Sequence, residues 1–234
     1  MRRVNGSART ALVVAAVMLG VGEARAQGDA SKAVEGGGIS VSGWMGKVDA
    51  AEAQRGQTVN SAKFAPEGKG FHVKTGPATT YWKSGAPAKG DYTVKATFTE
   101  PKYMGTNNHP HPYGIVIGGN DMGTDTQSLL YCAAYGNGNF IVRGFGPAAF
   151  QMNGGHGEMN AAVHKAEPGQ PLTQEVALQV KGNKVSCMVN GATVASYSKS
   201  DLVAAGKLKS TDGLYGVRFG HNTEAVVTGF ALSK

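Results

Sequence analysis

The feature that most constrains the fold is a repeated alternation between short apolar or β-branched runs and turn residues, which extends from Ile39 to Leu232. Gly, Asn, Pro or Asp bounds each run, as is typical of β-strands joined by tight turns. The 35 glycines among 234 residues follow no G-X-Y period, which excludes a collagen-like rod. A hydrophobic fraction of 41% argues against wholesale disorder. The pattern therefore predicts one all-β domain with a sizeable core.

Eleven segments carry the strand pattern, whereas only residues 200–206 carry helix signals, with a capping residue at one end and a glycine at the other. Because no long amphipathic helix separates these segments, we expect a mostly antiparallel β-sandwich with one short helical turn. The predicted strands are Thr58–Phe64, Gly70–Thr75, Thr79–Lys83, Tyr92–Glu100, Tyr113–Gly118, Leu129–Tyr135, Phe140–Phe145, Glu175–Lys181, Lys184–Tyr197, Leu214–Gly220 and Ala225–Leu232.

The first 26 residues have the features of a signal peptide. Arg2, Arg3 and Arg9 precede an apolar run over residues 11–19, and residues 24–26 form a small-x-small cleavage site. The apolar run is too short to span a bilayer, and no later segment is long enough. We therefore predict a signal peptide over 1–26, a flexible arm over 27–38 and one β-sandwich domain over 39–234, exported to the periplasm or the extracellular space.

The charge pattern gives no indication of a nucleic-acid partner. The leader holds four Arg and one Glu, so its removal lowers the formal net charge from +7 to +4. The remaining lysines are scattered and form no basic stripe with interleaved aromatic residues. We therefore expect neither a nucleic-acid partner nor a membrane span.

The register of two predicted hairpins bears on the two cysteines. Gly182-Asn183 fits a two-residue turn, which places Leu178 opposite Cys187 on an apolar face directed to the core. The same reasoning on the hairpin over residues 129–145, with a two-residue turn at 137–138, places Cys132 opposite Arg143 on the polar face. Two cysteines in an exported protein invite a disulfide, but these registers direct them to different faces. The sequence leaves their pairing open.

The second hairpin also gives Arg143 a special position. An arginine in an otherwise apolar strand needs a partner or a wet face, and on a curved sandwich the wet face is the concave one. That register puts on the core side Tyr131, Tyr135, Phe140 and Val142.

Several segments resemble a known superfamily. The strand, turn and strand over residues 185–194, the G-x-x-G-V-R segment over 213–220 and the closing run at 226–230 resemble the concanavalin A-like (laminin G-like) jelly roll, and residues 114–119 resemble its central strands. Residues 44–49 and 75–82 resemble exported bacterial proteins labelled 3-keto-disaccharide hydrolase-like or family 16 glycoside hydrolase-like. The resemblance implies a jelly-roll fold and a carbohydrate ligand.

The catalytic motif of family 16 is missing. Those glycosidases carry E-x-D-x-x-E or E-x-D-x-E on one strand, so that a nucleophile and an acid share one face. None of the 15 carboxylates after the leader makes this pattern. We therefore favour a non-catalytic carbohydrate-binding sandwich, and we do not decide from the sequence whether the protein is an enzyme. The alternatives are an enzyme that cleaves 3-keto-glycosides by elimination and a structural or adhesion module of the cell envelope.

The candidate ligand-binding residues follow from the chemistry of sugars. Polar side chains would donate hydrogen bonds to sugar hydroxyls, aromatic rings would stack on the sugar, and the Pro-flanked histidines would line the rim of the site. The alternative is that the aromatic rings pack in the core and that the histidines belong to a rigid loop. The candidates are Trp82, Tyr103, His109, His111, Asn120, Asp121 and Arg143, with Tyr81 and Tyr113 as further rings. In the elimination alternative, the base and the electrophile would come from His109, His111, Asp121 and Arg143.

We predict no metal cofactor. His109 and His111 have no third ligand nearby in the sequence. Residues 119–125 offer oxygen ligands for calcium but lack the spacing of an EF-hand loop, so we interpret them as an Asx-rich turn and keep calcium as the alternative.

Overall fold

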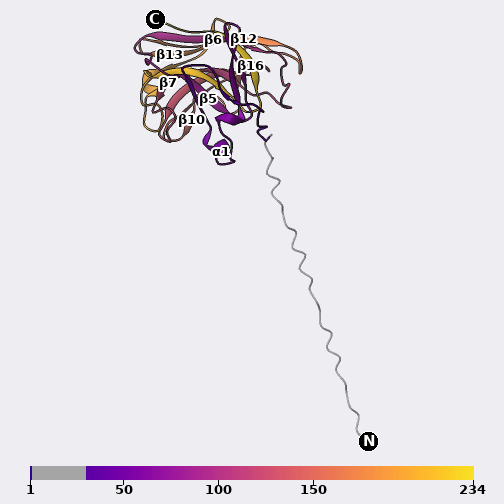
Figure 1. Ribbon diagram of the computed structural model, residues 1–234. Coiled ribbons are helices and arrows are strands. Elements are labelled where there is room, and N and C mark those ends of the chain that lie inside the picture. Colours follow the sequence, from indigo (N-terminus) through magenta and orange to yellow (C-terminus); the bar gives the residue numbers. More distant parts are fainter. Residues whose placement is uncertain (2–29) are drawn as a thin grey trace. The chain divides into compact units, whose positions relative to one another are not determined.

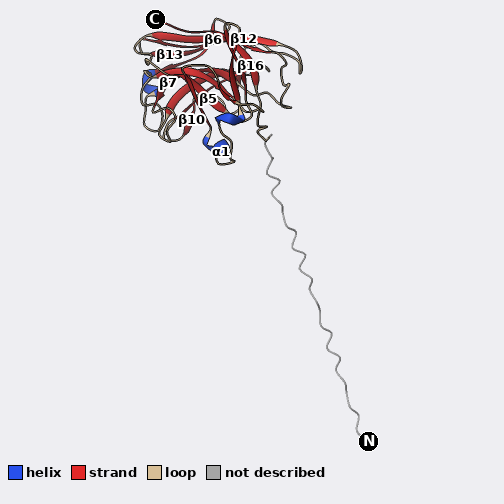
Figure 2. Ribbon diagram, viewed as in Figure 1, coloured by secondary structure: helices blue, strands red, loops and turns tan. Residues whose placement is uncertain are grey.

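Two large β-sheets pack face to face in the unit formed by residues 31–234 (Figures 1 and 2). The computed structural model describes Met1 and residues 30–234, so the predicted signal peptide and the first residues of the predicted arm lie outside the described residues, apart from Met1. No helix among the described residues is long and apolar enough to cross a membrane.

The first sheet, called the β6 sheet here, has the strand order β1-β3-β4-β16-β6-β12-β13-β14 and forms the upper layer in Figure 1. Its pairs are antiparallel except for β1 and β3. The strands are β1 (Gly38–Ile39), β3 (Lys63–Glu67), β4 (Gly70–Lys74), β6 (Tyr92–Glu100), β12 (Leu172–Lys181), β13 (Lys184–Val189), β14 (Ala192–Ser198) and β16 (Glu224–Ser233).

The second sheet, called the β7 sheet here, has the order β10-β9-β8-β7-β15-β5-β2, and β11 also pairs with β9. The strands are β2 (Trp44–Val48), β5 (Thr79–Lys83), β7 (Tyr113–Asn120), β8 (Ser128–Ala134), β9 (Asn139–Phe145), β10 (Ala149–Gln151), β11 (Glu158–Met159) and β15 (Leu214–Phe219). The helical elements are short: α1 (Ala50–Ala53), the 3₁₀ turn η1 (Val59–Ser61) and α2 (Lys199–Leu202).

The main core lies between the two sheets because alternate side chains of each strand point inward. Along β6, the residues Tyr92, Val94, Ala96 and Phe98 are buried and belong to this core. The aromatic rings from the two sheets meet there, with Phe98 of β6 and Tyr113 of β7 stacked at a ring separation of 5.0 Å. The predicted all-β sandwich is confirmed.

The predicted strands agree with the observed ones apart from local differences. Residues 58–61 form a capped 3₁₀ turn before β3, because the Thr58 and Ser61 hydroxyls satisfy backbone donors there. The predicted strand over residues 184–197 divides at Asn190-Gly191, where both residues have positive φ. Part of the predicted flexible arm is also docked, since Val34 donates a backbone hydrogen bond to Ser61 and β1 pairs with β3.

The hairpin of β12 and β13 has the predicted register, with Leu178 opposite Cys187. The register predicted for β8 and β9 is wrong by one residue, because Cys132 lies opposite Val142 rather than opposite Arg143. The turn has three residues, 136–138, closed by a hydrogen bond from Tyr135 N to Asn139 O. Gly138 has φ of 91°, as such turns require. A shift by one residue exchanges the two faces of a strand, so Tyr131 faces outward and Cys132 inward.

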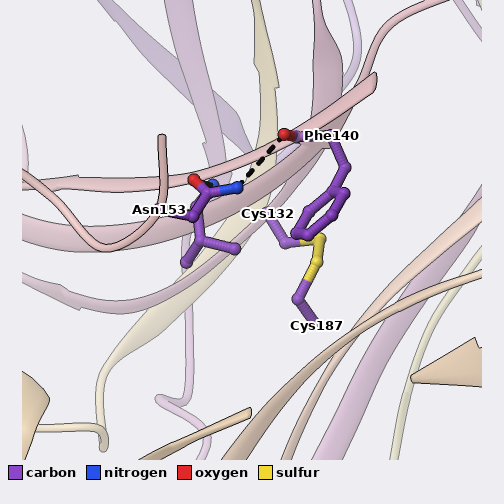
Figure 3. The surroundings of a disulfide bond; sticks show 5 residues. Cys132, Phe140, Asn153 and Cys187 are labelled. Carbon is purple, nitrogen blue, oxygen red and sulfur yellow. Dashed lines mark hydrogen bonds between the residues drawn. A yellow bond between two sulfur atoms is a disulfide. The ribbon is translucent and has the colours of Figure 1, made fainter. Parts of the chain in front are cut away.

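The corrected register explains the disulfide between Cys132 and Cys187, which joins β8 to β13 across the core (Figure 3). The two Cα atoms are 5.7 Å apart. The Phe140 ring lies beside the sulfur atoms, and the carbonyl of Phe140 accepts a hydrogen bond of 3.2 Å from the Asn153 side chain. The disulfide therefore links the two sheets directly.

Candidate functional site

The outer face of the β7 sheet carries a second apolar cluster, which does not touch the core between the sheets. Its buried members are Val116, Leu129, Tyr131, Ala133 and Ile141. A sheet face directed away from the core is usually polar. This cluster forms an apolar floor. Three half-buried side chains, Tyr135, Arg143 and Phe145, lie on or beside it. We call these three residues and the exposed Gln151 the outer-face patch.

Arg143 occupies the middle of this patch. It lies directly opposite Tyr131 on β8 and Gln151 on β10, so the three side chains share the outer face. Its guanidinium donates a hydrogen bond to the carbonyl of Gly155, while Nε is buried without a hydrogen-bond partner. Burial raises the pKa of Tyr135, and the charge of Arg143 opposes that shift, as expected for close neighbours. Arg143 therefore points away from the main core, as predicted, but the predicted register is wrong by one residue and the face around Arg143 is apolar rather than polar.

A second arginine, which the sequence analysis did not select, anchors the same face. The Arg218 side chain donates to both carboxylate oxygens of Asp49, one at 2.8 Å, and to Thr80 at 2.8 Å. Its guanidinium carbon lies 4.8 Å from the Tyr131 ring centre and 5.0 Å from that of Phe145. Burial alone would lower the pKa of Arg218, but the charge of Asp49 raises it, and the net shift is upward. Arg218 thus holds two rings of this face in place.

The alternation of inward and outward side chains along β15 could have identified Arg218. Val217 and Phe219 are core residues, so the residue between them must point outward. An outward arginine that is only 7% exposed requires a counter-charge, which Asp49 supplies from a distant part of the sequence.

Asn120 and Asp121 lie at the far end of β7 from the two predicted histidines. Eight residues of strand separate these groups by roughly 23 Å. The Asn120 side chain donates to the carbonyls of Gly118 and Asp212, and Asp121 forms an ion pair with Lys209. These contacts support the interpretation as a structural turn, and the calcium alternative stays a prediction.

The structure buries the aromatic rings that were candidates for stacking. Trp82 is 2% exposed and Tyr103 is 3% exposed. Tyr81 and Tyr113 belong to the main core. Trp82 points to the outer face but is covered by the loop at Gly123. None of these four rings therefore presents an open face to a ligand, and Tyr135 and Phe145 are better placed.

The β6–β7 loop brings His109 and His111 to one end of the sandwich. Pro110 and Pro112 fix their own φ angles and restrict the residues before them to extended conformations, which stiffens the backbone at both histidines. The Nε2 atoms of the two rings are 2.7 Å apart. His111 is buried, whereas His109 is exposed.

The β15–β16 loop brings a third histidine, His221, to the same place. The ring centres of His111 and His221 are 4.0 Å apart. One potential ligand nitrogen from each of His109, His111 and His221 can be chosen so that all three lie within 4.8 Å of one another. We call these three residues the histidine cluster. His221 was missed because it lies 110 residues beyond His111 in the chain, and only the fold brings the two together.

A cleft of about 660 Å³ adjoins the histidine cluster. Thr106 and Asn222, which neighbour the cluster in sequence, form part of its wall. Glu224 lies in the cleft 3.0 Å from Lys74 and 2.9 Å from the His72 ring. Burial raises the pKa of Glu224, but Lys74 and His72 lower it more, so the net shift is downward. The remaining wall residues are Lys32, Ala33, Val34, Glu35, Lys63, Thr75 and Gly105.

The structure therefore does not gather the predicted site residues into one site. The histidines lie at one end of the sandwich, Asp121 lies at the other, and Arg143 lies between them on an outer face.

Comparison with solved structures confirms the fold. No protein-family model matches the sequence, and no curated protein matches it. The carbohydrate binding module CBM66 from Bacillus subtilis superposes with a TM-score of 0.55 at 9% identity, covering 84% of this chain and 99% of the module. A Bacillus subtilis protein of unknown function with a galectin-like fold gives a TM-score of 0.50 at 11% identity, covering 81% and 88%. The chain has a concanavalin A-like jelly-roll fold.

Proposed function

We propose that the protein binds carbohydrate on the outer-face patch and that it is exported. The observation that carries the proposal is the half-buried set of Tyr135, Arg143 and Phe145, with Gln151 beside it, above an apolar floor on the outer face of a jelly-roll sheet.

The chemistry of the patch suits a sugar. The C–H faces of a pyranose ring pack on aromatic rings, which Tyr135 and Phe145 supply. The guanidinium of Arg143 and the amide of Gln151 each have further N–H groups besides those that donate to the carbonyls of Gly155 and Asn153, and a sugar hydroxyl can accept from such a donor. Because the Tyr131 ring and Arg218 fix the floor beneath, little side-chain order has to be gained on binding.

The fold and the predicted leader support the same proposal. The structural neighbour with the higher TM-score is a carbohydrate binding module, and this chain covers almost all of it. A disulfide in the core fits an oxidising compartment, and the leader predicts export to the periplasm or the extracellular space.

The elimination enzyme is less well supported as an alternative. Its candidate base and electrophile would come from the histidines, Asp121 and Arg143, yet these groups are spread over both ends and one face of the sandwich. An adhesion module would use a protein partner, and it is distinguished by the experiment below.

The proposal is tested by screening the full chain on a glycan array and by measuring the Kd of the strongest ligand by calorimetry. Arg143→Ala and Tyr135→Ala should each weaken binding about 10- to 100-fold, because a hydrogen bond to a charged group or a stacked ring is lost. Lys184→Ala on β13 of the opposite sheet removes an exposed positive charge outside the patch and should leave Kd unchanged.

Two results would contradict the proposal. One is a wild-type protein that binds no glycan, which favours the adhesion module. The other is a pair of patch variants that bind with wild-type affinity, which places the sugar elsewhere. Retained circular dichroism spectra confirm that the variants are folded.

A further inference from the structure

We propose that His109, His111 and His221 form a binding site for a divalent transition-metal ion of the zinc class. The proposal stands on the convergence of three imidazoles from two loops, which the carbohydrate proposal does not use. One candidate ligand nitrogen from each ring lies within 4.8 Å of the other two.

The donor set selects the metal. Imidazole nitrogen is a borderline ligand that suits zinc, copper, nickel or cobalt, whereas calcium and magnesium prefer oxygen. Among the residues that the structure describes, no carboxylate belongs to the cluster. Three neutral ligands with a fourth position left for water are typical of open zinc sites. His109 is exposed, so that fourth position is accessible to solvent.

The neighbouring amides orient two of the rings. The Asn108 side-chain oxygen lies 2.8 Å from His109 Nδ1, so that nitrogen carries the proton, and the lone pair of His109 Nε2 is directed toward His111. Asn107 Nδ2 lies 3.0 Å from His111 Nδ1 and 2.7 Å from the carbonyl of Asn222, and because a carbonyl can only accept, the atom of the Asn107 amide that faces both partners is the donor nitrogen. His111 therefore carries its proton on Nε2, and this N–H donates a hydrogen bond to His109 Nε2.

Metal binding at His111 requires only a local change. The proton on His111 Nε2 has to move to Nδ1, where a rotated Asn107 amide would accept it through Oδ1. That oxygen is buried and accepts no hydrogen bond in the present arrangement. The rotation thus gives it a partner, while the carbonyl of Asn222 loses one of the two donors it has from Thr106 and Asn107. No net proton has to leave the ring.

The distances lie close to those that zinc needs. With Zn–N bonds of about 2.0–2.1 Å, two ligands of a tetrahedral site are roughly 3.3 Å apart. The Nε2 atoms of His109 and His111 are 2.7 Å apart, so they must separate slightly, and each of these two ligands must approach the His221 nitrogen by at most roughly 1.5 Å. The exposed His109 ring has room for most of this movement.

The two loops are fixed together before any metal binds. The Gly220 backbone N–H donates to the carbonyl of Pro112 at 2.7 Å. A Cβ atom at Gly220 would come within 2.9 Å of the Pro112 ring and 3.1 Å of His111, so only glycine permits this approach. Thr106 and Asn107 both donate to the carbonyl of Asn222, the residue that follows His221. The cluster is therefore held by the fold rather than assembled by the ion.

The experiment uses the full chain, purified with a tag free of histidine, and zinc chloride as the probe. Zinc content after desalting and competition with a chromophoric chelator give the stoichiometry and the Kd. We expect one zinc ion per chain. His111→Ala and His221→Ala should each weaken zinc binding by about 100-fold or more, which is at least the effect of losing an outer-shell partner. His109→Ala changes an exposed side chain, so it keeps the test valid if the His111 and His221 variants do not fold.

His164→Ala is the matched control, because His164 is an exposed histidine outside the cluster that contacts the carbonyl of Thr173. It should bind zinc like the wild type, and a large excess of calcium should not compete. The proposal is overturned if the wild type retains less than one zinc ion per chain, if the His109 variant binds as tightly as the wild type, or if His164→Ala loses as much affinity as the cluster variants. Since no sugar is present, this result is independent of the carbohydrate proposal.

Discussion

Replacing Glu100 by Gln should remove a large part of the pH dependence of the protein's stability. Glu100 ends β6 and is 5% exposed, and its Oε2 atom is buried without a hydrogen-bond partner. Burial raises the pKa of Glu100 from 4.5 to about 7, although a hydrogen bond from Tyr113 acts in the opposite direction. The folded protein therefore holds a proton on Glu100 at pH values where the unfolded chain has lost it.

The sign and the size follow from proton linkage. Because the pKa is higher in the folded state, the free energy of unfolding falls as pH rises between about 4.5 and 7 and is level above that range. A shift from 4.5 to about 7 costs the folded state about 3 kcal/mol at pH 8, of which about 2.5 kcal/mol develops between pH 5 and pH 8. Glu100→Gln cannot ionise and escapes this loss.

The assay is urea unfolding of the wild type and of Glu100→Gln at pH 5 and pH 8. The stability of the variant relative to the wild type should rise by about 2.5 kcal/mol from the lower to the higher pH. A fixed cost of the new amide cancels in this comparison. The exposed Glu167→Gln is the control and should change stability by less than about 0.5 kcal/mol at either pH. An equal effect of Glu100→Gln at both pH values would refute the reasoning.

Two further predictions concern stability. Replacing Cys132 and Cys187 together by alanine should lower the free energy of unfolding by about 4 kcal/mol, because the bond closes a loop with a sequence separation of 55 residues; a loss below about 1 kcal/mol in urea unfolding would contradict this. Asp49→Asn should cost about 3 kcal/mol, since it leaves the buried charge of Arg218 without its counter-charge. The exposed Asp125→Asn should cost less than about 1 kcal/mol, and equal losses in thermal unfolding would count against the buried-pair argument.

Local patterns predict the strands well because a strand and its turn are neighbours in sequence. The register of β12 and β13 follows from the two-residue turn at Gly182-Asn183. In β8 and β9 the glycines at 136 and 138 also permit a three-residue turn, and the sequence offers no means of choosing between the two. That single residue decided the direction of Cys132 and with it the disulfide.

The candidate site was harder to predict because its parts come from distant segments. The Pro-flanked histidines were recognisable, but their partner His221 lies beyond nine intervening strands of the chain. Trp82 was chosen for its ring, yet its exposure depends on a loop some forty residues later that covers it. Arg143 was chosen correctly as an outer-face residue because a charge in an apolar strand is itself a local signal.

The geometry of the sandwich keeps the two proposed sites separate. Arg143 lies two strands away from β7, opposite Tyr131, which in turn lies opposite Val116. With strands about 4.8 Å apart and a rise of about 3.3 Å per residue, Arg143 is roughly 14 Å from the start of β7, where the loop of the histidine cluster begins. An ion in the cluster therefore cannot coordinate a monosaccharide seated against Arg143. The two proposals can therefore be tested independently, and only a longer glycan that extends from the outer face around the end of the sandwich would connect the two proposed sites.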